Sequence, residues 1–365
     1  MGKKKRLSFE AKDAEKFSFA YRHSRLLTAL ALFAVATSAF LIRFSSTQAI
    51  EAQCFTGDDE YWHLHIINQM KPYRPSVDYQ SWLPSGREIV HPPVYHYLIY
   101  FASSLSGRPA FNIMFYIGPF ISAVGVAAWF LLCRELYGDF AGLVGASVYA
   151  VLPFTVAKTV VGSARPQALA EVICVLGMWL FFCAYHKESK PLALVSGVVL
   201  GVAALTWESA LFLYIPLVLL FYLLHLLFRK ASRSVHNVCL LTLALAFALA
   251  LAWYVPVYVK YGIWGNTPSY LLKATTMFWK PDLLFTFYST LVANHVFYAV
   301  AIVAFPFLLI YNLAKREFSR EFLALMLMGL GLLALVFFSM RIINAILGSG
   351  IILVFASLLA PSSTT

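Results

Sequence analysis

The 365-residue sequence is poor in charge, because Asp, Glu, Lys and Arg together make up only 12% of it. Soluble domains carry about 25% charged residues and about 45–50% apolar ones. This chain is instead 61% hydrophobic, with a mean hydropathy of +0.74. Such a composition excludes a water-soluble enzyme, a disordered chain and a collagen-like rod, and it predicts a polytopic membrane protein.

Several familiar motifs are missing as well. The sequence has no P-loop, no CxxC pair, no helical HExxH and no Asn-X-Ser/Thr acceptor, which removes the chemistries that depend on them. It has no repeated halves of the transporter kind. Of its five cysteines only Cys54 falls in a predicted external loop, so we expect no disulfide.

The sequence does contain a series of apolar runs, each long enough to cross a bilayer, which takes about 20 residues. The runs predict an all-α protein with about ten transmembrane helices and a long first external loop. Residues 191–206 and 209–228 also fit a re-entrant hairpin, which lowers the count by two. The predicted spans are 26–43, 111–132, 140–160, 168–185, 191–206, 209–228, 235–257, 292–312, 321–339 and 343–360.

The 28 basic residues outnumber the 17 acidic ones by 11. They cluster in short connections between spans, where they set membrane orientation, so we expect no nucleic-acid partner. The pattern predicts a multi-pass protein of the plasma membrane with a cytoplasmic N-terminus and an external active site. The predicted parts are a basic tail 1–25, a first span 26–43, an external loop 44–110 with amphipathic or re-entrant helices, spans over 111–257, a second external loop 258–290, and further spans with a short tail over 291–365.

Candidate chemistry begins in loop 44–110. Asp58, Asp59 and Glu60 place three carboxylates side by side at the start of a predicted helix. Adjacent acids repel one another, and hard cations such as Mg²⁺ or Mn²⁺ favour carboxylate oxygens. The alternative is that the acids only favour the positive end of the helix dipole.

A second notable segment, 81–93, reads SWLPSGREIVHPP and contains Trp82 and His91. The apolar stretch 94–106 follows it. That stretch cannot be an ordinary span without inverting every later loop, so we expect a helix at the outer surface or a re-entrant one.

Six segments together carry a resemblance. In chain order they are DEYWHLH, WLPSGREIVHPP, CREL, GSARPQALAE, LGVAALTWESALF and MRIINAILGSGIILVFA. Their order and spacing resemble the catalytic subunit of oligosaccharyltransferase in its archaeal or bacterial single-subunit form. The resemblance implies a GT-C membrane glycosyltransferase that moves an oligosaccharide from a polyprenyl (dolichyl) phosphate or pyrophosphate carrier to the side-chain amide of Asn in an acceptor polypeptide.

The resemblance also implies roles for particular residues. Asp59, with His63 and Leu64 in register, falls on the family's first acidic motif and is expected to ligate Mn²⁺ or Mg²⁺ and to contact the acceptor amide. Arg341, which opens a late span, is expected to hold the acceptor. Its alternative role is that of an interfacial cation reaching the lipid headgroups. Trp82 and His91 are further candidates for substrate binding.

Two departures from the family pattern stand out. Where a second acidic motif is expected, the sequence has Arg165 or Pro166, and the nearest carboxylate is Glu171. We therefore expect Glu171 to be the second metal ligand, or else to lie in water near the outer boundary. Arg165 is expected to bind a lipid phosphate, which a guanidinium does well. The family's Glu in loop 258–290, its C-terminal soluble domain and its WWDYG motif have no counterpart here.

Three alternatives to protein glycosylation stay open. The run HPPVYHYL also resembles GT-C transferases that pass a single sugar from a polyprenyl phosphate to a hydroxyl or lipid acceptor. The missing acids equally fit a catalytically degenerate homologue that binds the carrier. A fragment of a longer protein is the third.

Overall fold

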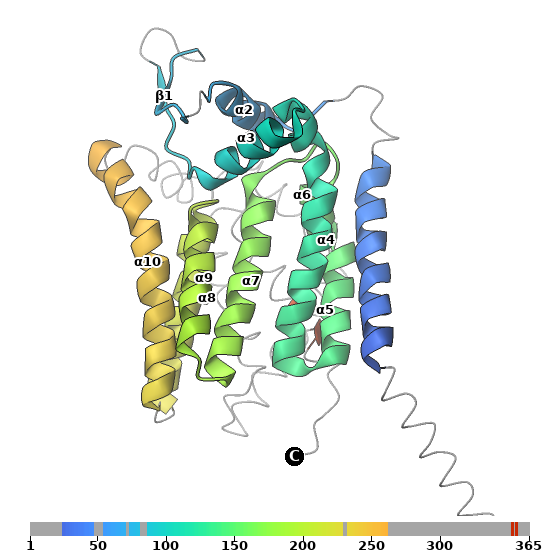
Figure 1. Cartoon of the computed structure of the whole chain (residues 1–365), viewed down its shortest axis with the longest axis vertical. Coiled ribbons are helices and arrows are strands. Elements are labelled where there is room, and N and C mark those ends of the chain that lie inside the picture. Colours follow the sequence, from blue (N-terminus) through green and yellow to red (C-terminus); the bar gives the residue numbers. More distant parts are fainter. Residues whose placement is uncertain are drawn as a thin grey trace, which may run out of the picture.

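The computed structural model describes residues 24–46, 54–70, 73–80, 86–228 and 232–261, together with Ile352, Leu353, Phe355 and Ala356. Long helices stand side by side in a bundle, and shorter elements lie across one end of it (Figure 1). The helices are Ser24–Phe44, α2 Asp58–Asn68, α3 Val94–Ser106, α4 Ala110–Tyr137, α5 Asp139–Val151, α6 Pro153–Thr159, α7 Pro166–His186, α8 Lys190–Ala204, α9 Ser209–Phe228 and α10 Arg233–Tyr261.

Four of the described helices are long and apolar enough to cross a membrane: Ser24–Phe44, α4, α7 and Arg233–Val257 within α10. The bent pair α5 and α6 makes a fifth if it counts as one span. The predicted multi-pass helical architecture is therefore confirmed. Segments 1–25, 258–290 and 291–365 lie almost entirely outside the described residues, so their boundaries stay predictions.

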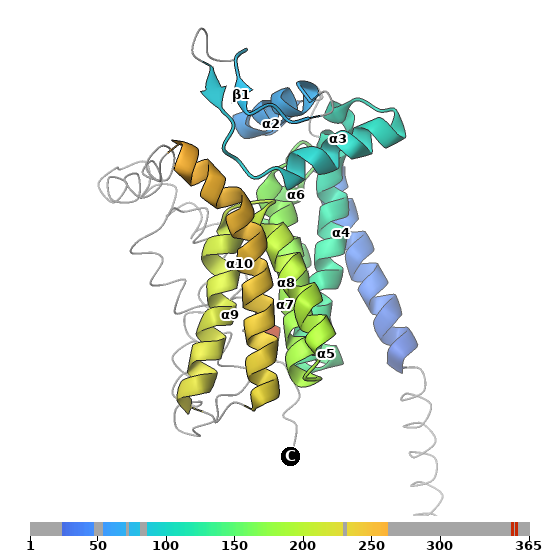
Figure 2. The same cartoon turned by 60° about the vertical axis from the view of Figure 1, so that its left-hand side comes forward.

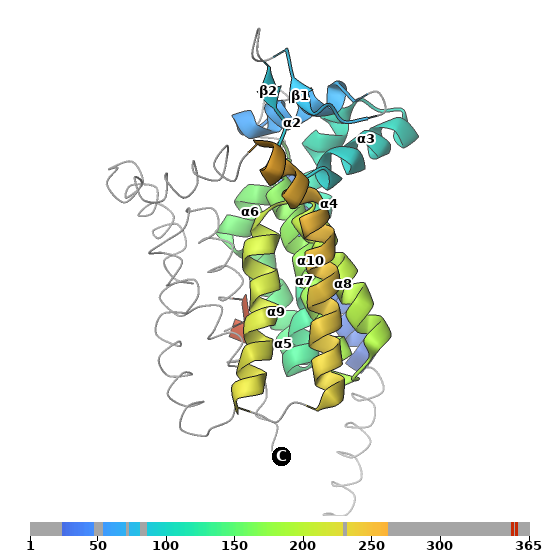
Figure 3. The same ribbon diagram turned by 90° about the vertical axis from the view of Figure 1, so that its left-hand side faces the viewer.

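The shorter elements form what we call the cap, which comprises α2, α3 and a small ribbon between them. The ribbon adds two strands to the predicted all-α architecture. They are β1 Val77–Asp78 and β2 Arg87–Glu88, which pair antiparallel with Val77 opposite Glu88. Helix α3 lies across the end of the bundle (Figure 2), and the ribbon projects beyond α2 (Figure 3). The stretch 94–106 is thus a helix that lies across one end of the bundle and does not pass through it, and its predicted place on the outer face stays a prediction.

Small residues allow the bundle helices to approach closely. A Cβ atom added at Gly197 of α8 would lie 2.8 Å from the carbonyl oxygen of Thr242 on α10, and one at Gly201 would lie 2.7 Å from Leu249. Helices in membranes associate largely by such close packing of small residues. Helix α8 therefore needs glycine at both positions to pack against α10.

A separate apolar cluster fastens the cap to the bundle. Tyr95 and Ile99 of α3 and Ile67 of α2 pack with Met114 and Phe115 of α4, and all five are almost fully buried. Burial of apolar surface stabilises such a contact by about 25 cal/mol per Å². The cap is therefore held to the end of α4 by its own hydrophobic core.

The predicted span 140–160 is not one straight helix, because α5 and α6 meet at an angle of 61°. Pro153 has no N–H group, so it cannot donate a helical hydrogen bond to the carbonyl of Tyr149. The Thr155 hydroxyl donates to that carbonyl instead, at 2.6 Å. A hydropathy window does not detect this break, because the two halves together are long and apolar enough to pass as one span.

Arg43, near the end of helix Ser24–Phe44, stabilises the bent pair. Its side chain is fully buried. It donates to the Thr159 hydroxyl at 2.6 Å, to the Ala150 carbonyl at 2.8 Å and to the Ala39 carbonyl at 3.1 Å. A buried guanidinium is tolerated only where its donors find acceptors. The bent pair α5–α6 supplies two of those acceptors, the Thr159 hydroxyl and the Ala150 carbonyl.

Candidate active site at the cap

The acidic start of α2 meets the start of α7. Arg165 is the N-cap residue of α7, and its Nε donates to Glu60 Oε1 at 2.7 Å. Its Nη1 lies 4.0 Å from Asp59 Oδ2. The Glu60 side chain is fully buried, whereas the Asp59 side chain is 44% and the Arg165 side chain 29% exposed. A half-exposed carboxylate thus lies beside a fixed positive charge.

Backbone hydrogen bonds hold the loop that carries Arg165. The Gly162 N–H donates to the Phe115 carbonyl at 2.9 Å, and the Thr56 N–H donates to the Gly162 carbonyl at 3.1 Å. The Tyr95 hydroxyl donates to the Ala164 carbonyl at 2.6 Å. These bonds connect the loop to α4, to the start of α2 and to α3. The position of Arg165 is therefore fixed from three sides.

Buried histidines line the same end of the bundle. His63 Nδ1 and His96 Nε2 lie 3.0 Å apart, so one ring donates to the other. Burial lowers the pKa of His63 to about 3, and the charges of His91, Arg74 and Arg165 add to the effect. Burial, followed by Arg74, His63 and His91, likewise lowers the pKa of His96. Both rings are therefore neutral at physiological pH.

His91 lies next to this pair. Its ring stacks on Trp207 with centroids 5.8 Å apart and an angle of 13° between the planes. It also lies edge-on to Trp62, at 4.9 Å, and to His63, at 6.0 Å. Trp207 belongs to the loop between α8 and α9. His91 therefore connects the cap to the bundle close to the Asp59 end of α2.

Arg74 brings a further positive charge to the cap. Its guanidinium lies over the Trp253 ring of α10, 5.6 Å from the centroid, and its Nη2 donates to the Ile89 carbonyl at 3.5 Å. Burial lowers the pKa of Arg74 to about 10, and Tyr97 partly offsets the effect. Arg74 thus stays charged at neutral pH and attracts anions to this end of the molecule.

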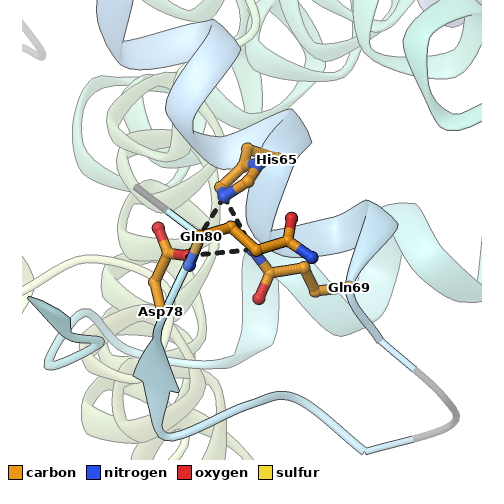
Figure 4. Close-up of polar contacts among 4 residues, drawn as sticks. All are labelled: His65, Gln69, Asp78 and Gln80. Carbon is orange, nitrogen blue, oxygen red and sulfur yellow. Dashed lines mark hydrogen bonds and ion pairs between the residues drawn. The ribbon is translucent and has the colours of Figure 1, made fainter. Parts of the chain in front are cut away.

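A polar cluster joins the ribbon to α2 (Figure 4). Oδ1 of the buried Asp78 accepts hydrogen bonds from Gln69 Nε2 at 3.1 Å and from the backbone N–H of Gln80 at 3.0 Å, and it lies 3.1 Å from His65 Nε2. Gln69 Nε2 also lies 2.6 Å from His65 Nε2. This cluster holds the ribbon against α2, the helix that carries Asp59.

A comparison with protein families decides the identity of the chain. Residues 61–358 match the family model described as "Oligosaccharyl transferase STT3, N-terminal". The match covers most of the 365 residues. The chain belongs to the STT3 oligosaccharyl transferase family. The helical membrane fold and the family predicted from the sequence are thereby confirmed.

Individual relatives agree with this family. The chain is 29% identical over 190 residues to "Dolichyl-phosphooligosaccharide-protein glycotransferase 1" of Archaeoglobus fulgidus, a match that covers 50% of this chain and 30% of the relative. This STT3-family chain therefore spans about a third of the length of that curated relative.

Solved structures share the fold. The archaeal oligosaccharyltransferase AglB from Archaeoglobus fulgidus, in complex with an inhibitory peptide and a dolichol-phosphate, has a TM-score of 0.70 at 13% identity and covers 92% of this chain and 50% of its own. The Archaeoglobus fulgidus oligosaccharyltransferase complex with Zn and sulfate has a TM-score of 0.64 at 15% identity, covering 90% and 48%. ArnT from Cupriavidus metallidurans bound to undecaprenyl phosphate has a TM-score of 0.61 at 15% identity, covering 91% and 59%.

The structure brings some of the predicted STT3 site residues together. Asp59 and Arg165 lie side by side, and His91 contacts the His63 ring. Trp82 and Arg341 lie outside the described residues, so their predicted roles stay predictions.

Glu171 lies deeper in the bundle. It follows Arg165 by six residues of α7, about 9 Å along the helix axis. Its side chain is buried, and the ionisable groups around it include Tyr149, Lys158 and Cys174. In the part of the chain that the structure describes, no three His, Cys, Asp or Glu side chains are arranged to hold a metal ion.

Sequence reasoning missed the roles of Glu60 and His96. Glu60 is the buried partner of Arg165, and His96 is the buried partner of His63. A signal was present for His96, because it follows Pro92 and Pro93 at the start of an apolar helix, where a lone histidine needs a polar partner. No local signal distinguishes Glu60 from Asp59.

Proposed function

We propose that this chain is a glycosyltransferase that moves a glycan from a polyprenyl (dolichyl) phosphate or pyrophosphate carrier to the side-chain amide of asparagine in an acceptor polypeptide. The reaction takes place at the external face of the plasma membrane, with the N-terminus in the cytoplasm. Family membership and the AglB fold support the proposal. The observation that carries it is the half-exposed Asp59 carboxylate next to the Arg165 guanidinium.

The proposed chemistry uses these two groups. An amide nitrogen is a poor nucleophile, and a carboxylate that accepts a hydrogen bond from its NH₂ group loosens the amide conjugation. The nitrogen then attacks the anomeric carbon, the bond from that carbon to the phosphate oxygen breaks, and the configuration inverts. Asp59 takes the amide proton, and Arg165 binds the departing phosphate.

Other predicted residues complete the proposed site. His91 and Trp82 bind the sugar–phosphate part of the donor, and Arg341 holds the acceptor polypeptide. Arg74 adds to the positive field that attracts the anionic carrier. Each of these assignments is a proposal that substitution can test.

A divalent cation held by Asp59 and Glu171 does not fit the described residues. Among the described residues no three His, Cys, Asp or Glu side chains are arranged to hold a metal ion, and Arg165 already pairs with the acids of α2. The zinc in the Archaeoglobus fulgidus complex belongs to that protein. The proposed reaction therefore uses the Asp59 and Arg165 side chains and no metal ion.

Asp59→Asn tests the proposal. Membranes that contain the protein are incubated with a lipid-linked glycan and a peptide that carries Asn-X-Thr. We expect Asp59→Asn to lower peptide glycosylation at least 100-fold, the scale of losing one group that stabilises charge in a transition state. Asp139→Asn is the matched control, because Asp139 is 52% exposed and pairs with Arg134 away from the cap.

A Gln-X-Thr peptide provides the second control. Glycosylation that ignores the asparagine, or that survives in Asp59→Asn, would contradict the proposal. Transfer of a single sugar to a lipid or hydroxyl acceptor would support the alternative reaction of a GT-C transferase.

A further inference from the structure

The Asp59 and Glu60 carboxylates at the start of α2, which we call the carboxylate cluster, lie next to the positively charged guanidinium of Arg165. Glu60 has no exposed surface, and its Oε1 accepts a hydrogen bond from Arg165 Nε at 2.7 Å. Among the described residues, its other oxygen, Oε2, has no hydrogen-bond partner. A buried carboxylate is stable only beside a compensating charge. Arg165 supplies that charge from α7.

The backbone of α2 is shaped to receive this guanidinium. A Cβ atom at Gly57 would lie 2.6 Å from Arg165 Nη2 and 3.0 Å from Glu60 Oε2. A side chain at position 57 would therefore force the Arg165 guanidinium to shift from its place beside Glu60. The glycine leaves the space that Arg165 fills.

A divalent cation competes for the same space. Mg²⁺ binds carboxylate oxygens at about 2.0–2.1 Å. The guanidinium lies 2.7 Å from Glu60 Oε1 and 4.0 Å from Asp59 Oδ2, so it lies against both carboxylates at once. A metal ion could bind there only after Arg165 had left, and its departure would leave a repelling cation close by.

We propose that the Arg165 guanidinium is the permanent cation of this carboxylate cluster, so the native chain binds no divalent metal at Asp59 and Glu60. The inference rests on the proposed function only in its consequence, which is that Arg165 neutralises the departing phosphate without a metal. A guanidinium suits this role because it stays charged and offers planar, paired donors to phosphate oxygens.

Metal binding by the purified protein tests the inference. Titration of the detergent-solubilised native chain with Mn²⁺, followed by electron paramagnetic resonance and by the thermal unfolding midpoint, is expected to show no site that Asp59→Asn abolishes. Arg165→Asp removes the cation and adds a third carboxylate. This variant is expected to bind one Mn²⁺ and to unfold at a higher temperature with Mn²⁺ than with EDTA.

The control is Arg108→Asp, which makes the same change of charge at an exposed position between α3 and α4. It is expected to gain no Mn²⁺ site. If Arg165→Asp does not fold, the native titration still decides, because one bound Mn²⁺ lost in Asp59→Asn would overturn the inference. A native chain that binds no Mn²⁺ but glycosylates no peptide would contradict the proposed function and leave this inference standing.

Discussion

At the scale of single residues, the cap depends on polar groups buried in pairs. His63 and His96 share one hydrogen bond of 3.0 Å inside the cap, and Glu60 shares one with Arg165. Buried polar groups cost free energy unless they are satisfied by such partners. Both pairs join segments that are far apart in the sequence, so each also fixes the path of the chain.

The histidine pair predicts a pH dependence. The unfolded chain binds protons on both rings below about pH 6.5, whereas burial keeps the pKa of His63 in the folded protein at about 3 and that of His96 also below its ordinary value. Stability is therefore complete above pH 6.5 and falls as the pH decreases toward 3, by about 1.4 kcal/mol per pH unit for His63, and His96 adds a loss in the same direction.

Thermal unfolding between pH 7.5 and 4.5 checks this expectation. His96→Phe keeps an aromatic ring in place but removes one titrating group, so its unfolding midpoint should depend less steeply on pH than that of the native chain. An equally steep dependence would show that the acid sensitivity arises elsewhere.

The site residues could be predicted only in part. Asp59 stands out because three acids occur in a row, and Arg165 stands out because the family pattern expects an acid there. Glu60 is the buried partner of Arg165 because the orientation of α2 on the bundle points its side chain at the start of α7. Tertiary packing sets that direction, and no local pattern encodes it.

At the scale of elements, apolar length predicts most of the helices that the structure describes. Predicted spans such as 111–132 and 168–185 coincide with α4 and α7, and the stretch 94–106 coincides with α3. The break between α5 and α6 was missed, because it depends on Pro153 and on an arginine from a different helix. The ribbon was missed because its strands have two residues each.

Arg43 provides a test at this scale. Arg43→Gln leaves several buried acceptors of α5 and α6 without their donor, at about 1–3 kcal/mol each. We expect it to lower the free energy of unfolding by about 3 kcal/mol, measured by denaturant titration in mixed micelles. Arg25→Gln is the matched control, because Arg25 is exposed near the other end of the same helix. Equal losses in the two variants would argue against a special role for Arg43.

At the scale of the whole molecule, a bundle of apolar helices supports a polar cap at one end. The low charge of the sequence predicts the bundle, and the distribution of Lys and Arg predicts that the cap faces outward. The orientation matters for the proposed function, because a lipid-linked donor and an acceptor polypeptide must meet at the same membrane face.

The native cysteines allow the orientation to be tested. Cys54, at the edge of the cap, is exposed, whereas Cys133, Cys174, Cys183 and Cys239 are buried. A membrane-impermeant maleimide added to intact cells is expected to label the native chain and to leave Cys54→Ser unlabelled.

The opposite end of the bundle supplies the control. Lys187→Cys in the Cys54→Ser background places a thiol in the exposed turn after α7. It is expected to react only after the cells are permeabilised. Labelling of Lys187→Cys in intact cells, or of the native chain only after permeabilisation, would reverse the proposed orientation.

The pair formed by Glu60 and Arg165 joins positions separated by 105 residues. During synthesis Glu60 leaves the ribosome long before Arg165, so the carboxylate must wait in a hydrated, open cap until α7 inserts with its first residue at the cap end. The Glu60–Arg165 pair can therefore form only after the helices between them have been inserted and the start of α7 lies at the cap. If α7 were inserted in the opposite direction, Arg165 would lie at the far end of the bundle and the buried Glu60 would lack its compensating charge.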